Sequence, residues 1–313
     1  MQGEPDIRVS APQLKARAKE LGFDLCGIAR AHKVDPSRLD KWFANGWDAS
    51  LDYVRRRRDE RLDPSFLVPN ARSVIVLAVS YAPAVEDPQP RPGELVVARY
   101  ARGRDYHNVF RKPLRRLAEW LRSYGADVYS ETDTGAILEK YWAQEAGIGW
   151  IGKNGCLIHE RLGSWLLLSA LVTDLAFEPD APHPDRCGDC ALCMPACPTQ
   201  AFPEPRYVDA RKCIAFHTIE HRGPIAPELT ERFGNRLFGC DVCQEVCPWN
   251  RHPPPRKLVQ LTPRTPSLAA DEILALTPEE ARQKFEGTPL ARAGREGLAR
   301  TARALSGSTS RGR

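Results

Sequence analysis

Two cysteine-rich stretches determine how the second half of this chain folds. Residues 187–198 read CGDCALCMPACP, and residues 240–248 read CDVCQEVCP. Cys213 lies between them, so eight of the ten cysteines in the 313-residue chain fall between residues 187 and 247. Cysteines at such close spacing bind a metal or a cluster, or form disulfides. Their exact spacing distinguishes among these uses.

The first stretch has the spacing C-x2-C-x2-C-x3-C-P, the bacterial ferredoxin signature for a [4Fe–4S] cluster. In that signature the fourth cysteine binds the other cluster of a pair. The second stretch lacks one cysteine of this pattern, and Cys213 can replace it. The eight cysteines then form two complete four-thiolate sites. These are Cys187, Cys190, Cys193 and Cys247 for the first cluster, and Cys197, Cys213, Cys240 and Cys243 for the second.

Two other uses of these cysteines fit the sequence less well. A zinc ribbon uses separate C-x2-C pairs, because tetrahedral zinc needs only two close ligands from each pair. A disulfide framework needs an oxidising compartment. The N-terminus has no apolar signal segment, and no stretch approaches the roughly 18 apolar residues of a membrane span. The sequence therefore predicts a cytoplasmic redox protein.

Strands and helices alternate over the first 175 or so residues. Ser10 and Gln13 form a capping box that opens a helix, Gly22 ends it, and residues 73–81 form an apolar, β-branched run typical of a covered central strand. We also expect strands at 23–28, 126–129 and 164–173 and helices at 107–124 and 135–146. This pattern predicts an α+β protein with an N-terminal α/β layer domain. Proline-rich stretches suggest three parts: 1–178, a ferredoxin-like domain at 179–252, and a short helical region at 253–313.

Residues 147–152, GIGWIG, match the dinucleotide-binding pattern G-x-G-x-x-G. That fingerprint needs a strand before it and a helix after it, whereas here a helix precedes it and a strand is expected to follow. Two interpretations remain open: a helix C-cap with a turn, or a backbone loop that a large ligand can approach closely. Cys156 follows in this glycine-rich segment, and Cys26 lies in an apolar run that suits a core.

The basic charge is concentrated at the C-terminal end. Residues 251–313 carry 12 Lys and Arg against 6 Asp and Glu, whereas the preceding 250 residues carry 33 against 34. A basic tail on a neutral body indicates either a polyanionic partner or an ordinary solvated helical surface. We expect helices near 267–274, 277–284 and 294–305, and disorder over the last eight residues.

Several further motifs occur in a characteristic order. They are YARGRDYH at 100–107, DTGAILE at 133–139, GWIGKN at 149–154, TIEHRGP at 218–224 and FEGTPLARAG at 285–294. Together with the cysteine stretches, the chain from about residue 10 to 305 resembles the epoxyqueuosine reductase family, in its short form without a helical-repeat extension. The resemblance implies a cobalamin-dependent iron–sulfur enzyme with two [4Fe–4S] clusters. The first-cluster cysteines would lie nearer the cobalt.

The resemblance also implies a reaction, in which epoxyqueuosine at the anticodon wobble position of a tRNA is reduced to queuosine. The position matching the family's proton donor is Asp133. A solvated Asp has a pKa near ~3.9, so an acid role needs a desolvated site that raises this pKa. The local sequence alone favours an ordinary N-cap, in which the carboxylate accepts a backbone hydrogen bond, whereas the resemblance favours the acid role. The two roles shift the pKa in opposite directions.

The corrin is expected to lie on the N-terminal domain against the glycine-rich loop. The predicted contacts are Arg57, Tyr106, His107, Gly149, Trp150, Gly152, Lys153 and Asn154. His107 is not predicted as a cobalt ligand, because the glycine of D-x-H-x-x-G is absent after it. Trp150 could form a wall of the base pocket or could simply pack in the core. His217 and His221 are expected at a helix end rather than as a metal pair.

The expected partners are a tRNA bearing epoxyqueuosine and a low-potential electron donor of the flavodoxin or ferredoxin type, with no membrane and a monomer sufficient. The predicted phosphate contacts are Lys257, Arg264, Arg292, Arg295, Arg300 and Arg303. Three rival hypotheses are a cobalamin iron–sulfur reductase resembling the reductive dehalogenases, a two-cluster electron carrier, and a cobalamin-handling protein. The last would not need eight cluster thiolates.

Overall fold

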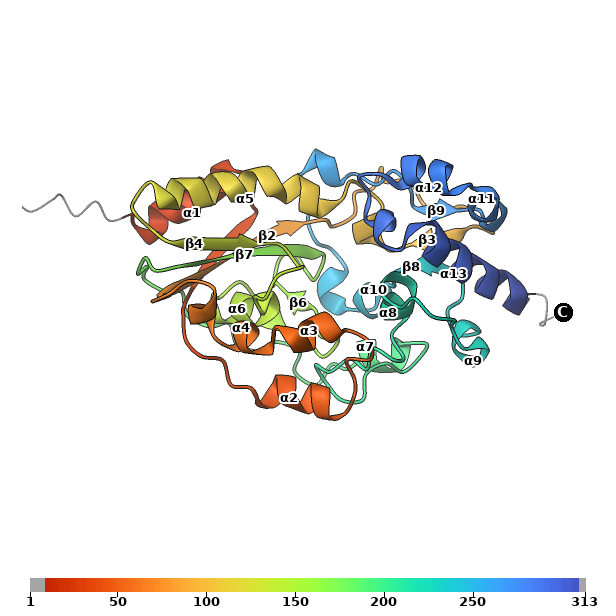
Figure 1. Ribbon diagram of the computed structural model, residues 1–313, viewed down its shortest axis with the longest axis horizontal. Coiled ribbons are helices and arrows are strands. Elements are labelled where there is room, and N and C mark those ends of the chain that lie inside the picture. The colour runs from red at the N-terminus through yellow and green to blue at the C-terminus, as the bar shows by residue number, and fades with distance from the viewer. Residues whose placement is uncertain (1–8, 310–313) are drawn as a thin grey trace, which may run out of the picture.

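A computed structural model of the chain describes residues 9–309 (Figure 1). The helices are α1 (Ala11–Glu20), α2 (Ser37–Ala44), α3 (Asp52–Arg56), α4 (Arg58–Leu62), α5 (Tyr106–Arg122), α6 (Glu139–Glu145), α7 (Cys193–Ala196), α8 (Ile214–Ile219), α9 (Pro227–Thr230), α10 (Val242–Glu245), α11 (Ala270–Ala275), α12 (Pro278–Phe285) and α13 (Gly294–Thr309). The strands are β1 (Leu25–Arg30), β2 (Ser73–Ser80), β3 (Leu95–Val97), β4 (Val128–Glu131), β5 (Trp150–Ile151), β6 (Leu157–Ile158), β7 (Leu166–Thr173), β8 (Arg236–Phe238) and β9 (Ser267–Leu268). The predicted mixture of helices and strands is confirmed.

The main sheet has the strand order β1-β2-β7-β4, and each neighbouring pair runs antiparallel. All eight residues of β2 are buried, as its continuous apolar sequence predicts. Helices α1 and α5 pack on one face, where Leu14 and Leu117 meet Ile75 and Leu77. Helix α6 packs on the other face through Trp142, and Figure 1 shows these helices on opposite sides of the sheet. The sheet is therefore the middle layer of three.

The predicted N-terminal elements are present with small shifts in their ends. The Ser10–Gln13 capping box is confirmed, with both of its reciprocal hydrogen bonds. The backbone at Gly22 has φ +97°, which glycine adopts without strain, and the chain there leaves α1 for β1. Strand β1 begins two residues later than predicted and β4 also begins two residues later.

Helix α6 is shorter than the sequence suggested. We expected a helix from residue 135, but α6 begins at Glu139, and its N-cap is Leu138. The reason lies in Glu131, whose carboxylate accepts hydrogen bonds from the backbone N–H groups of Ala136 and Ile137. These bonds hold residues 132–138 in a loop instead of a first helical turn. The N-cap interpretation of Asp133 is therefore wrong.

The GIGWIG segment forms a helix end and a hairpin, and does not form a dinucleotide fingerprint. Gly147 follows α6 with φ +69°, which confirms the C-cap interpretation. β5 then pairs with β6 in antiparallel orientation. A Cβ atom on Gly149 would lie 2.1 Å from Ile158 O, and one on Gly152 would lie 2.5 Å from Ile158 Cδ1. The two glycines therefore permit the close approach of the neighbouring strand.

A second core unites parts of the chain that the sequence assigned to three domains. Strands β8, β3 and β9 form one sheet, although they come from residues 236–238, 95–97 and 267–268. Val97, Phe238, Leu268 and Leu298 are buried in the same cluster of side chains. The C-terminal region is thus part of the cluster-bearing half instead of a separate layer. Helix α13 continues to Thr309, so residues 306–309 are helical where disorder was expected, and residues 310–313 lie outside the described part.

None of the helices in residues 9–309 is long and apolar enough to cross a membrane.

The linker after Pro253–Pro255 is fixed by a buried ion pair. Arg256 Nη1 donates to Asp87 Oδ2 over 2.6 Å, and each side chain is only 6% exposed. Burial raises the pKa of Asp87, but the bonds from Arg256 and the Ala84 backbone offset this, and the net pKa lies below its usual range. The pair anchors the linker to the loop that follows β2.

We expect Asp87→Ala to lower the free energy of unfolding by about 3–5 kcal/mol, because it leaves Arg256 buried and unpaired. Chemical denaturation monitored by circular dichroism measures this. The control is Glu279→Ala, which breaks the exposed Arg282–Glu279 pair and should cost less than about 1 kcal/mol. Equal effects from both substitutions would contradict the assignment.

Candidate active site and cluster-binding cysteines

The eight cysteines separate in space into the two predicted groups. Cys187, Cys190, Cys193 and Cys247 line one cavity of about 210 Å³. The thiol of Cys193 interacts electrostatically with the other three. In the second group, Cys213 interacts with Cys197, and both Cys240 and Cys243 interact with Cys213. Among residues 9–309, no three His, Cys, Asp or Glu side chains are arranged so that they could hold one metal ion.

Two predicted corrin contacts, Trp150 and Lys153, lie at the first cysteine group. Trp150 is fully buried, and its indole Nε1 donates to Cys187 Sγ over 3.4 Å. Lys153 lines the same cavity, and its Nζ donates to Gly188 O over 2.7 Å. Hydrogen bonds to the sulfur ligands are one means by which a protein tunes a cluster potential. The packing interpretation of Trp150 is therefore the one that the structure supports.

Asn154 joins the glycine-rich loop to the second cysteine group. Its Nδ2 donates to Cys243 O over 3.2 Å, while its Oδ1 accepts from the Cys156 backbone N–H over 3.1 Å. The side chain is 4% exposed. The Cys156 thiol consequently lies against that of Cys243. Asn154 thus positions a cluster ligand in this structure.

A loop at the end of β4 presents Asp133. Its backbone has φ +61°, which is unusual for a residue other than glycine, and its N–H donates to Glu139 Oε1 over 2.6 Å. A Cβ atom on Gly135 would lie 1.2 Å from Glu131 Oε2, so only glycine fits beside the Glu131 carboxylate. The loop is therefore held by hydrogen bonds from its backbone N–H groups to the carboxylates of Glu131 and Glu139.

Two residues at the start of α5 contact the Asp133 carboxylate. The Tyr106 hydroxyl donates to Asp133 Oδ2 over 2.8 Å. His107 Nε2 lies 3.6 Å from the same oxygen, and His107 Nδ1 lies 2.8 Å from Asp105 Oδ1. The rings of Tyr106 and His107 are stacked, with centroids 4.2 Å apart. Because the Asp133 side chain is 54% exposed, a substrate can reach it.

These contacts set the charge of the site. Desolvation raises the pKa of Asp133, but the contacts with His107 and Tyr106 outweigh it, so the net pKa lies below the usual range. The hydrogen bonds to Asp105 and Asp133 raise the pKa of His107 to about 9. At neutral pH the carboxylate is therefore ionised beside a protonated imidazole. The raised pKa that an isolated acid would need is absent from Asp133.

Aromatic rings connect this site to the second cysteine group. Tyr106 lies 6.1 Å from Tyr100, and Tyr100 lies 6.3 Å from Phe238, between ring centroids. Phe238 is two residues before Cys240. Tyr100 also interacts electrostatically with both Asp133 and Asp241. This geometry brings the second group toward Asp133, whereas the resemblance implied that the first group lies nearer the cobalt.

A buried polar atom beside the Asp133 loop has unused hydrogen-bonding capacity. Arg61, which interacts electrostatically with Glu131 and Glu139, is 7% exposed, and its Nε has no hydrogen-bond partner among the described residues. Buried polar atoms normally have one. A ligand with many amide groups, such as cobalamin, can provide partners, so the residues present fit that cofactor. Arg57 also lies near this site, where it bonds to Glu60 and interacts with Tyr129.

Comparison with known proteins gives the same picture. Residues 186–250 match a family model described as a 4Fe-4S double cluster binding domain, and residues 61–134 match "Epoxyqueuosine reductase QueG, DUF1730". An epoxyqueuosine reductase of Gloeobacter violaceus is 41% identical, over 96% of this chain and 97% of its own length. This chain belongs to the epoxyqueuosine reductase family. The predicted enzyme class and the two [4Fe–4S] clusters are thereby confirmed.

Solved epoxyqueuosine reductases share the fold. One, in a crystal structure with an epoxyqueuosine-modified tRNA-Tyr stem loop, is 30% identical with a TM-score of 0.88, over 94% of this chain and 80% of that one. Another, from Bacillus subtilis, is 29% identical with a TM-score of 0.84 over the same shares, and its catalytic loop, which carries an aspartate, is swung out of the active site.

Sequence reasoning missed several residues of this site. Glu131, Tyr100 and Arg61 were not selected. Glu131 holds the Asp133 loop, Tyr100 interacts electrostatically with Asp133, and Arg61 interacts with Glu131 and Glu139. Tyr100 was visible as the first residue of a recognised motif. Glu131 had one available signal, its place at the end of a predicted strand just before a turn. Arg61 had none, because it lies far before Glu131 in the sequence and only folding brings the two together.

The pairing of cysteines predicts how substitutions combine. We expect Cys187→Ala/Cys247→Ala to lose only the first cluster and about half of the iron, because both ligands serve one site. Cys187→Ala/Cys243→Ala should lose nearly all of it. Iron and sulfide analysis after anaerobic reconstitution distinguishes the two, with Cys26→Ala as the control that keeps both clusters. Equal iron in the two double variants would refute the pairing.

Proposed function

We propose that this chain reduces the epoxide of epoxyqueuosine at the wobble position of a tRNA anticodon to give queuosine. The reaction consumes two electrons and two protons, and the epoxide oxygen leaves as water. Membership of the family supports this function, as does the tRNA stem loop bound to a relative. The observation that carries it is the exposed Asp133 carboxylate, held beside a protonated His107 on the side of a cluster site.

The cysteines and the polar atoms near Asp133 would hold the cofactors. The eight thiolates bind two [4Fe–4S] clusters, and thiolate-bound clusters reach the low potentials that this chemistry requires. Arg61, whose Nε is unpartnered among the described residues, would face the cobalamin together with Arg57 and the ring of His107. Cobalamin reduced to Co(I) supplies a strong nucleophile or electron donor toward an epoxide carbon. The remaining requirement is a proton, because an epoxide oxygen leaves poorly as an alkoxide.

Asp133 and His107 together can provide that proton. Asp133 alone cannot store it at neutral pH, because the contacts with His107 and Tyr106 keep its pKa low. His107 stores it instead, since Asp105 stabilises the imidazolium. When a bound substrate excludes water, the pKa of Asp133 rises and the proton can pass from Nε2 to Oδ2. Asp133 then donates it to the epoxide oxygen.

The two clusters would act in the order opposite to the one the resemblance suggests. The second group, with Cys213, Cys240 and Cys243, lies toward Asp133 through Tyr100 and Phe238. The first group includes the exposed Cys190 in a cavity lined by Lys153 and Arg186. A low-potential flavodoxin or ferredoxin would donate electrons there. A tRNA substrate places the reaction in the cytoplasm, and a monomer is sufficient for it.

The test is to incubate the reconstituted, reduced protein under anaerobic conditions with epoxyqueuosine-containing tRNA. Mass spectrometry of the digested tRNA detects queuosine, with and without cobalamin. Queuosine formed only with cobalamin supports the proposal. If both clusters are present and reducible and cobalamin is bound, absence of queuosine would mean that the substrate is wrong.

Asp133→Asn should lower single-turnover queuosine formation by about 10²–10⁴-fold, because the amide cannot donate as an acid while the loop is retained. Reduction of both clusters, followed by electron paramagnetic resonance, should not change. A two-cluster electron carrier would instead retain all its activity in this variant, so unchanged turnover would favour that rival.

His107→Gln should change the pH dependence of the reaction. In the wild type, the rate should hold up to about pH 9 and fall above it, as His107, whose pKa is raised to about 9, loses its proton. In the variant, the fall should begin at a lower pH than in the wild type, because only the Asp133 carboxyl remains, and a carboxyl ordinarily titrates far below an imidazole whose pKa is about 9. Tyr106→Phe is the control, since it removes a hydrogen bond without removing the reservoir. A uniform loss at every pH in His107→Gln would mean a purely structural role.

A further inference from the structure

The basic residues that the sequence assigned to RNA are mostly engaged within the protein. Arg292 pairs with Glu220 over 2.7 Å, and Arg295 donates to Leu276 O over 2.6 Å. Arg300 donates to His217 O over 2.5 Å, and Lys257 pairs with Asp24 over 3.1 Å. These cations hold the C-terminal region onto the second core. The RNA backbone therefore needs other contacts.

Helix α5 offers unpaired cations beside a cavity. Lys112 and Arg116 are exposed, lie four residues apart on one face, and have no side-chain partner among the described residues. Arg104, just before the helix, is also exposed and without a partner. Like charges four apart destabilise a helix, so their placement costs stability unless an anion binds there. The cavity that these three cations line has a volume of about 370 Å³.

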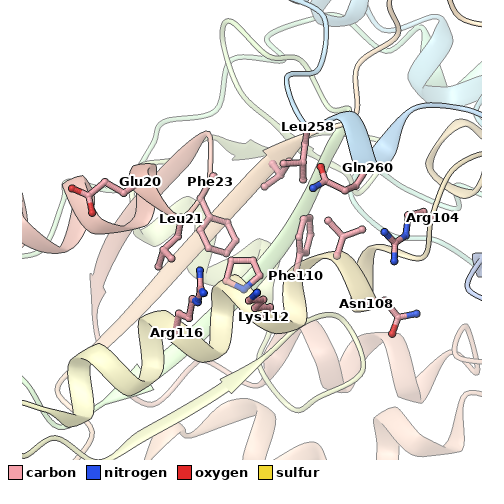
Figure 2. Close-up of a pocket in the computed structure, with 14 residues that line it drawn as sticks. Glu20, Leu21, Phe23, Arg104, Asn108, Phe110, Lys112, Arg116, Leu258 and Gln260 are labelled. Carbon is pink, nitrogen blue, oxygen red and sulfur yellow. The ribbon is translucent and has the colours of Figure 1, made fainter.

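The cavity has an apolar floor and polar ends. Figure 2 shows Phe23 and Phe110 between the end of α1 and α5, with Leu258 and Gln260 on the segment above them. Val259, in the same segment, is 79% exposed. The one acidic residue of the lining, Glu20, is paired with Arg17 over 3.0 Å. The cavity thus presents net positive charge around apolar side chains.

This combination is the chemistry of a single-stranded nucleic acid site. Proteins bind unpaired nucleotides with a positive groove for phosphates and apolar or aromatic surfaces for bases. Asn108 and Gln260 add amide groups that can bond to a base edge. A small anion would need only one of the three cations. Three cations along the rim of the cavity fit successive phosphates of a nucleic acid strand.

The position of the cavity fits the proposed substrate. The first turn of α5 separates the two sites, because His107 contacts Asp133 while the adjacent Asn108 lines the cavity. A strand that places its wobble base at Asp133 can therefore continue around the start of α5. Four helical residues advance about 6 Å, so Asn108, Lys112 and Arg116 lie at successive steps along that course.

We propose that this cavity binds an unpaired nucleotide of the substrate RNA next to the reacting base, with Arg104, Lys112 and Arg116 on its phosphates. The proposal rests on the proposed function and adds a substrate-binding site to it.

The test measures binding of a fluorescently labelled anticodon stem loop to the reconstituted full-length protein by anisotropy at several salt concentrations. Lys112→Glu and Arg116→Glu should each weaken binding by about tenfold, and Lys112→Gln should reduce the salt slope by about 0.7. In turnover, the KM for tRNA should rise and kcat should be retained. Arg115→Glu is the matched control, because Arg115 lies on the same helix, changes charge equally and does not line the cavity.

The outcomes separate the two proposals. If the wild type binds the stem loop and forms queuosine, but Lys112→Glu and Arg116→Glu match the Arg115→Glu control, the cavity assignment is overturned and the function stands. If GMP binds and only GMP binding depends on Lys112 and Arg116, the cavity is a mononucleotide site and the assignment is again overturned. A wild type that neither binds the stem loop nor forms queuosine overturns both. Thermal unfolding confirms that these surface variants are folded.

Discussion

The need to surround each cluster with four thiolates is the constraint on which the rest of this structure depends. The first site takes three cysteines from residues 187–193 and its fourth from Cys247, while Cys197 leaves for the other site. The intervening chain must therefore fold back on itself. That return brings β8 beside β3 and buries Phe238 with Val97. The need for four thiolates at each cluster thus accounts for the packing of the cysteine-rich part of the chain against the N-terminal part.

The active-site loop depends on a smaller interaction of the same kind. Glu131 uses its carboxylate to bind the backbone of Ala136 and Ile137, and Gly135 leaves room for it. The helix that the sequence favours over this segment is thereby delayed to Glu139. Residues 132–138 therefore form a loop, in which the Asp133 carboxylate contacts Tyr106 and His107. The hydrogen bonds of the buried Glu131 carboxylate therefore prevent one helical turn from forming and leave Asp133 exposed in a loop.

The number of charged residues in a segment does not show which of them are free to bind a partner, because many form bonds within the protein. The C-terminal excess of Lys and Arg suggested an RNA surface, yet Arg292, Arg295 and Arg300 serve as internal anchors. Lys112 and Arg116, which have no side-chain partner among residues 9–309, lie instead on α5 beside a cavity, in the neutral part of the chain. In the same way, Asp133 has its charge set by its neighbours, so the acid–base unit is the group of Asp105, His107 and Asp133 and not one carboxyl.

The sequence by itself determined how the eight cysteines group, the strand β2, the helix α5 and the family, because cysteine spacing and hydrophobic periodicity act over short distances along the chain. Only the tertiary structure decided where α6 begins, which residues face Asp133, and that Trp150 and Lys153 lie at the first cysteine group. Those outcomes depend on interactions between residues far apart in sequence, such as Arg61 with Glu131 and Tyr100 with Phe238. No local pattern encodes such contacts, since they form only when distant segments compete for the same buried space.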